Sequence, residues 1–262
     1  MMRLAAIAFL VAVWGGCATT GPGEGGAIPT SFEEALEILN SSEVADRIEA
    51  VQYIGAERDP RGLVPLQEAL GDEDLLVRLE ATLALRNYDS PVTIPLLRPI
   101  LEDEDADMRY SAAVALFELD DYSGVDVLVE GLRSQRSNYR LTSALFLSRI
   151  RWRPAVPGLL EMLTDEDPRN RSQAAYSLGW IFCAPEAVDP LLAAMKDPVP
   201  FVRKDAWEAL KQITGETLPF SYEAGPELRE AQLVVWRRWR LAHREETAPP
   251  TPSPVPAEES GE

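Results

Sequence analysis

The chain has 262 residues, of which 46% are hydrophobic and 26% are charged, a composition that is typical of a protein able to bury a substantial core. Its formal net charge is -18 at pH 7. A charge of this sign repels nucleic-acid phosphates and anionic membrane surfaces, so it argues against a nucleic-acid partner.

Residues 1–16 have the pattern of an export signal. Arg3 supplies a positive charge, and residues 4–14 form an unbroken apolar run of eleven residues. A helix that spans a bilayer needs about 20 such residues, so this run is too short for one. Two glycines and Cys17 follow, and this stretch resembles the cleavage site of a bacterial lipoprotein signal, although Trp14 stands where that family prefers an aliphatic residue.

The resemblance implies that Cys17 becomes the first residue of the processed protein and carries the lipid. Several acyl chains hold a protein firmly on a membrane, so we expect membrane contact through this lipid only. The alternative is a plain secretory signal with an incidental cysteine. Ala18 is not the aspartate associated with inner-membrane retention, which favours the outer membrane, facing the periplasm.

The composition changes again on either side of the central region. Residues 17–30 are rich in Gly, Thr and Pro, which predicts a flexible tether. Residues 247–262 are rich in Pro and Glu with almost nothing to bury, which predicts a disordered tail. The folded domain is therefore expected at 31–246.

This central region repeats itself. Six arginines, here called the marker arginines, recur at spacings of 31, 31, 31, 31 and 32 residues: Arg47, Arg78, Arg109, Arg140, Arg171 and Arg203. Three residues after each stands a small side chain: Ala50, Ala81, Ala112, Ser143, Ala174 and Ala206. Seven residues after each stands an aliphatic one: Ile54, Leu85, Leu116, Leu147, Leu178 and Leu210. A second aliphatic pair follows, beginning with Leu66 and Leu70 and ending, one residue later in register, with Leu191 and Met195.

Residues four apart lie on one face of a helix, so each set predicts one helix, and turn formers such as those at 59–62 separate the two sets. One such hairpin cannot bury both of its faces, whereas a stack of hairpins can. The prediction is an all-α fold, an α-α superhelix of about six hairpins of ~31 residues. At its ends we expect an N-terminal half-repeat, opened by a capping box at 31–34, and a capping helix at 226–246 with Leu233, Trp236, Trp239 and Leu241.

The repeat resembles HEAT repeats of the short type found in phycobilisome lyase subunits. The stretch 75–85, with an Asp-rich loop before it, carries the resemblance, which covers about 31 to 214. The resemblance implies that the loop aspartates and the marker arginines pair from unit to unit and are structural. It also implies a protein-binding scaffold.

Sites for chemistry are few. The acidic loops, such as 72–74 and 102–105, suit the caps of the helices that follow better than a calcium ladder. His243 is the only histidine, so a histidine metal site is excluded, and we expect no catalytic residue, metal or cofactor and no small-molecule substrate. Cys183, which has no partner if Cys17 is lipidated, is expected to be a buried thiol.

The fourth repeat departs from the others and provides the candidate partner-binding residues. Where other units carry acidic or neutral residues it has Arg and Trp, the types enriched in binding hot spots. These residues are Arg133, Arg136, Arg149, Arg151, Trp152 and Arg153. The alternative is a solvated edge with Trp152 folded onto its neighbours.

The function that we expect is a non-enzymatic scaffold for an unidentified protein partner, exported and anchored in the cell envelope. The alternative is a cofactor-handling or chaperone subunit like those of the phycobilisome lyases. A fold says little about which molecule a repeat protein binds.

Overall fold

The computed structural model describes residues 27–88 and 90–243, and all secondary structure in these residues is helical. The predictions for the signal peptide at 1–16, for Cys17 and for the tail at 247–262 lie outside this part of the chain. The chain divides into two compact units, unit 1 (Met1–Gly131) and unit 2 (Leu132–Glu262).

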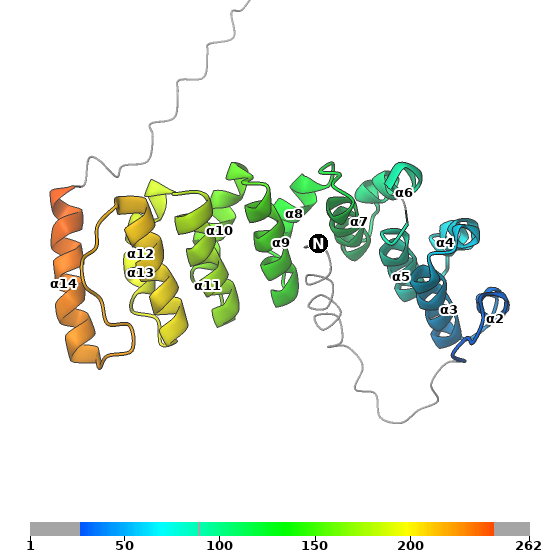
Figure 1. Ribbon diagram of the computed structural model, residues 1–262, viewed down its shortest axis with the longest axis horizontal. Coiled ribbons are helices and arrows are strands. Elements are labelled where there is room, and N and C mark those ends of the chain that lie inside the picture. The colour runs from blue at the N-terminus through cyan, green and yellow to red at the C-terminus, as the bar shows by residue number, and fades with distance from the viewer. Residues whose placement is uncertain (1–26, 89, 244–262) are drawn as a thin grey trace, which may run out of the picture. The chain divides into compact units, whose positions relative to one another are not determined.

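Unit 1 is a series of helical hairpins (Figure 1). Its helices are α2 (Phe32–Ile38), α3 (Val44–Glu57), η1 (Pro60–Gly62), α4 (Leu63–Ala69), α5 (Leu75–Leu85), α6 (Ser90–Leu97), η2 (Arg98–Glu102), α7 (Ala106–Glu118) and α8 (Val125–Gly131). α3 packs against α5, and α5 against α7, so neighbouring hairpins stack side by side. The predicted hairpins and their stacking are therefore confirmed within this unit.

Unit 2 continues the same pattern of hairpins. Its helices are α9 (Ser137–Arg149), η3 (Arg153–Ala155), α10 (Val156–Met162), α11 (Pro168–Tyr176), η4 (Ser177–Ile181), η5 (Pro185–Ala187), α12 (Val188–Ala194), α13 (Pro200–Thr214) and α14 (Pro226–Ala242). α9 packs against α11, and α11 against α13. We call the six helices that carry the marker arginines the marker helices: α3, α5, α7, α9, α11 together with its continuation η4, and α13.

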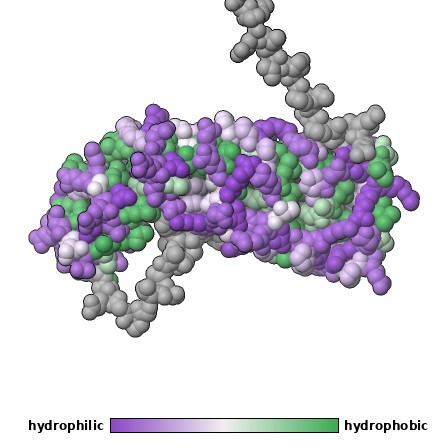
Figure 2. All heavy atoms as spheres, turned by 180° about the vertical axis from the view of Figure 1, so that it is seen from behind, coloured by the Kyte–Doolittle hydropathy of each residue, from purple (hydrophilic) through white to green (hydrophobic). Residues whose placement is uncertain are grey.

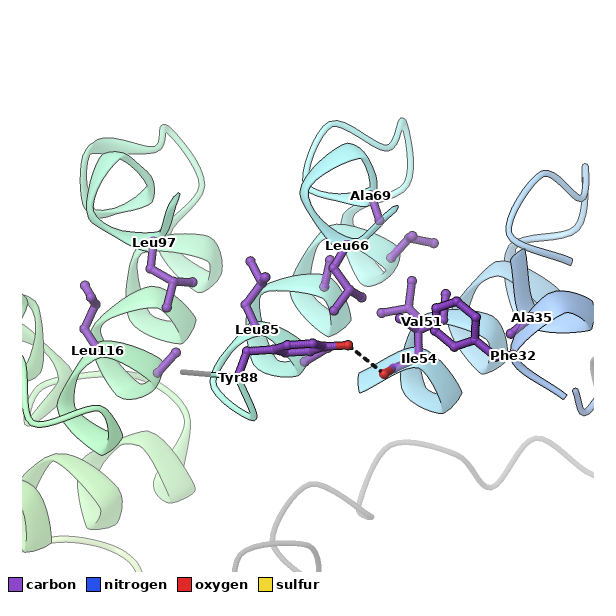
Figure 3. Close-up of a cluster of buried hydrophobic side chains, with 14 residues drawn as sticks. Phe32, Ala35, Val51, Ile54, Leu66, Ala69, Leu85, Tyr88, Leu97 and Leu116 are labelled. Carbon is purple, nitrogen blue, oxygen red and sulfur yellow. Dashed lines mark hydrogen bonds between the residues drawn. The ribbon is translucent and has the colours of Figure 1, made fainter. Parts of the chain in front are cut away.

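The predicted columns form the core. All six small residues and all six aliphatic residues of the marker helices are 0% exposed. In unit 1, Figure 3 shows Ile54, Leu85, Leu116 and the second-helix residues Leu66 and Leu97 pointing into one cluster between the helices. Each such side chain contributes about 1.5–3 kcal/mol by leaving water, so this column is what holds the hairpins together.

Neighbouring marker helices approach closely at one glycine in each unit. A Cβ on Gly55 would lie 2.6 Å from the Cβ of Ala84, and a Cβ on Gly179 would lie 2.4 Å from the Cα of Ala209. Both distances are too short for carbon atoms, and both glycines stand eight residues after a marker arginine. The same register therefore sets the same close approach in both units.

The single 32-residue spacing has a local cause. α11 continues into one π-helical turn, η4, which contains the buried Leu178 and inserts one residue before the next helix. Such an insertion shifts every later position by one without moving the core residue. The displaced pair Leu191 and Met195, both 0% exposed, confirms the shifted register.

The ends of the folded region differ in detail from the expectation. Ser31 Oγ accepts a hydrogen bond from the backbone N–H of Glu34 at 3.1 Å, but the Glu34 carboxylate accepts from Thr30, so the capping box forms on one side only. In α14, Leu233 and Trp236 are buried, whereas Leu241 is 72% exposed. Leu241 comes five residues after Trp236, which turns it about 140° away around the helix, and its expected place on the packed side is wrong.

Charged and polar side chains cover much of the surface. On the face drawn in Figure 2, hydrophilic residues predominate and hydrophobic residues show between them. No helix in residues 27–88 and 90–243 combines the length and the hydropathy that crossing a bilayer requires.

Candidate interaction surface

The marker arginines hold the loops that precede their own helices. In every described repeat, one guanidinium N–H group donates to two backbone carbonyls five and six residues earlier, for example Arg171 to Asp165 and Glu166 at 2.7 and 3.2 Å. The same pair of bonds is made by Arg47, Arg78, Arg109, Arg140 and Arg203. These bonds satisfy loop carbonyls that would otherwise lack a partner.

Three marker arginines also bind an aspartate of the next loop with both guanidinium edges. The shortest contacts are Arg47 to Asp72 at 2.8 Å, Arg140 to Asp165 at 2.5 Å and Arg171 to Asp197 at 2.6 Å, and every side chain in these pairs is at most 14% exposed. Such two-point contacts are the stronger kind of ion pair. Arg203 instead donates to the Tyr222 carbonyl at 2.8 Å.

The loop aspartates cap helices. Asp72 accepts the backbone N–H of Asp74 at 2.8 Å, and Asp74 in turn accepts that of Leu76 at 2.8 Å. The hydrogen bonds from Arg47 hold the pKa of Asp72 below its usual range, although burial opposes this shift. In residues 27–88 and 90–243 there is no group of three or more His, Cys, Asp and Glu side chains arranged to hold a metal.

The candidate arginines of the fourth repeat are engaged with neighbouring residues at four positions. Arg133 binds Glu161 through two contacts of 2.6 and 2.7 Å, and Arg153 donates to Glu186 at 3.1 Å and to the Phe182 carbonyl at 3.2 Å. Arg136 donates to the Tyr139 hydroxyl at 2.8 Å. Arg149 is exposed and has an interaction partner. The exposed ion pairs lie in solvent, where such pairs contribute little to stability.

Arg151 and Trp152 complete this edge. Arg151 is exposed, and its backbone φ of 55° places it in the left-handed region at the turn after α9. Trp152 is half-buried, and its indole N–H is buried without a hydrogen-bond partner among the described residues. Among the five candidate arginines, Arg151 is the one whose side chain has no hydrogen bond or ion pair with a described residue.

An exposed apolar surface lies elsewhere, on the marker helices of unit 2. Tyr176 and Trp180 are 46% and 43% exposed, and their rings stack with centroids 6.3 Å apart. Leu145 is 47% exposed and holds on α9 the repeat position that Tyr176 holds on α11. Adjacent helices place equal positions side by side, so these three residues form one patch, here called the aromatic patch.

The sequence carries only an ambiguous signal for the aromatic patch. Five residues after a marker arginine, counting along the helix places a side chain away from the buried columns, and a polar residue is expected there. Leu83, Val114, Leu145 and Tyr176 all break that rule. Among them, Leu145 and Tyr176 are the exposed ones, so spacing alone does not single out the patch. Aromatic residues with an exposed face are typical of protein-binding surfaces.

Cys183 is exposed, so its expected burial is wrong. Its φ of 45° places it at the left-handed turn that follows the marker helix, the position that Arg58, Asp120 and Arg151 hold in other repeats. All four residues are exposed, because this turn carries the chain away from the core. Cys183 sits one residue later in register than the others as a result of the π-helical turn.

The comparisons with known proteins agree with this architecture. A family model described as HEAT repeats matches residues 32–117, 94–179, 125–211 and 156–230, which together cover most of the chain. No curated protein matches it.

Several solved structures are similar to this chain. An engineered protein is 20% identical with a TM-score of 0.51, over 72% of this chain and 100% of its own. A designed armadillo repeat protein is 15% identical with a TM-score of 0.51, over 70% of this chain and 100% of its own. The complex of CpcE and CpcF of phycocyanin lyase from a Nostoc species is 21% identical with a TM-score of 0.47, over 87% of this chain and 93% of its own.

Proposed function

Because the chain belongs to the HEAT-repeat family, we propose that it is a non-enzymatic scaffold that binds a protein partner in the cell envelope. The observation that carries this proposal is the aromatic patch, which is held on packed marker helices and faces solvent. Packed helices hold the side chains of Leu145, Tyr176 and Trp180 in place before binding, so binding a partner costs little conformational entropy in these side chains.

The aromatic patch fits a protein partner better than a small molecule. Its three residues lie on the outer sides of two neighbouring helices, α9 and the helix formed by α11 and η4, and not in a closed cavity. Arg149 and Arg151, both exposed, follow on the same hairpin and add positive charge to a chain with a net charge of -18. Exposed aromatic groups with arginine beside them are the composition of binding hot spots.

The test of partner binding is capture from membranes with wild-type and variant protein. The double variant Tyr176→Ala/Trp180→Ala should lose a protein that co-purifies with the wild type. Tyr122→Ala is the matched control, because Tyr122 is 43% exposed, aromatic and part of unit 1. If the wild type and the double variant capture the same proteins in the same amounts, the aromatic patch is not the binding surface.

The proposed anchoring depends on Cys17. The lipoprotein-like sequence at 15–17 supports a lipid on that residue, and the acyl chains would hold the scaffold at a membrane. Cys17→Ser should move the protein from the membrane fraction to the soluble fraction, whereas Cys183→Ser should leave it on the membrane. Retention of Cys17→Ser on the membrane would contradict lipid anchoring without affecting the binding test.

A further inference from the structure

The outer side of the last helix, α14, is apolar. Leu228, Val234, Val235 and Leu241 are between 44% and 72% exposed, and Ala231 is exposed between them. Figure 1 shows α14 beside α12 and α13, with no other described helix of unit 2 on its outer side. The last helix of a repeat array normally presents a polar outer face, since nothing follows to cover it. The outer side of α14 therefore resembles a surface that another helix covers.

Two opposite charges lie on the same outer side of α14, near the two ends of this apolar stripe. Glu227 and Arg238 are eleven residues apart, which is about three helical turns, so they project from the same side of α14. Both are exposed, and neither forms an ion pair with another described residue of the chain. The other charged side chains of the helix differ, because Arg237 binds Glu230 at 2.7 Å and Arg240 binds Asp189 at 2.8 Å.

We propose that α14 packs antiparallel against α14 of a second copy of this chain, about a two-fold axis. In the register that the charges select, Glu227 faces Arg238 of the second copy and Ala231 faces Val234 of the second copy. A two-fold axis repeats both contacts, so the interface contains two ion pairs and a central apolar contact. The small side chain of Ala231 lets the two helix axes come close together.

The charge arrangement distinguishes this partner from others. A parallel pair of the same helices would place Glu227 near Glu227 and Arg238 near Arg238, which is unfavourable. An antiparallel pair places each charge opposite its complement without any other protein. The outer side of α14 is thus complementary to itself in one orientation only.

Sedimentation equilibrium of the full-length protein in detergent tests the proposal. The wild type should form a dimer as concentration rises. Arg238→Glu should weaken the dimer by about tenfold or more, because it places two carboxylates opposite each other at both ends of the stripe, and Glu227→Arg should do the same with two arginines. The double variant Glu227→Arg/Arg238→Glu should recover the wild-type dissociation constant, because the exchanged charges are again complementary.

The matched control is Lys204→Glu, which reverses an exposed charge on α13 of the same unit and should leave the dimer unchanged. Circular dichroism checks that each variant keeps its helix content. A wild type that stays monomeric up to about 100 µM, or a double variant as weak as the single ones, would overturn the proposal. A dimer that ignores both single reversals would also overturn it, since the contact would then lie elsewhere.

Discussion

Unit 1 and unit 2 are alike inside and different outside. Both bury the same two columns completely, and both bring marker helices together at a glycine eight residues after a marker arginine. The position five residues after the arginine differs. In unit 1 it holds the exposed Gln52, the half-buried Leu83 and the buried Val114. In unit 2 it holds Leu145 and Tyr176, which are 47% and 46% exposed, and the half-buried Glu208. Close packing restricts which residues can occupy the buried positions, whereas the residues at the exposed positions can vary and can contact a partner.

The largest expected effect concerns the shared interior. Leu116→Ala in unit 1 and Leu178→Ala in unit 2 should each reduce the free energy of unfolding by about 2–5 kcal/mol, because both side chains are fully buried and each change leaves a cavity. Urea denaturation followed by circular dichroism measures both. An effect below about half a kcal/mol at either site would place that residue on the surface and break the common register.

The second largest loss of stability is expected at the marker arginines. The loss should be larger for an arginine that binds an aspartate than for one that does not. Arg171→Ala removes the two-point contact with Asp197 as well as two carbonyl bonds, and should cost about 2–4 kcal/mol, since it leaves a carboxylate that is 7% exposed without its cation. Arg78 forms no ion pair within 4 Å among the described residues, so Arg78→Ala removes chiefly the two carbonyl bonds and should cost about 1–2 kcal/mol. Equal losses in urea denaturation would show that the aspartate contact contributes nothing.

The contribution of Asp72 to the free energy of unfolding should be smaller and should depend on pH. The pKa of Asp72 is lower in the folded protein than in the unfolded chain, with the Arg47 hydrogen bond as the main cause. A lowered pKa stabilises the fold above the unfolded pKa of about 4, and this stabilisation is lost as the pH falls through the folded pKa. Asp72→Asn lacks this contribution, so it should be less stable than the wild type at pH 7, and the difference should narrow below about pH 4. If the difference in stability between the wild type and Asp72→Asn stayed constant from pH 7 to pH 3, the lowered pKa of Asp72 would not be the cause.

The smallest effect on stability is expected at the outer positions. Tyr176→Ala/Trp180→Ala should change the free energy of unfolding by about 1 kcal/mol or less, because both residues are exposed, at 46% and 43%, and their rings stack on each other. The melting temperature of the double variant, compared with that of Leu178→Ala, measures this difference. A loss as large as that of Leu178→Ala would mean that the aromatic patch belongs to the core and is not a binding surface.

The candidate residues show where reasoning along the sequence was sufficient and where it was not. The resemblance to HEAT repeats implies a structural role for Arg171, and this residue makes the contacts described above. Arg153, of the same residue type, was a candidate for partner binding, and its contacts with Glu186 and Phe182 come from a turn 29 to 33 residues away. Such contacts depend on which turns neighbouring hairpins bring together, and spacing within one repeat does not specify them.

The sequence by itself determined the helices, the period and the buried columns, because a helix of 3.6 residues per turn converts regular spacing directly into a face. Only the tertiary structure decided the exposure of Cys183, the π-helical turn that absorbs the extra residue, and which apolar residues stay uncovered on α9, α11 and α14. The physical reason is that the area a side chain exposes depends on the neighbours that cover it, and those neighbours come from other hairpins.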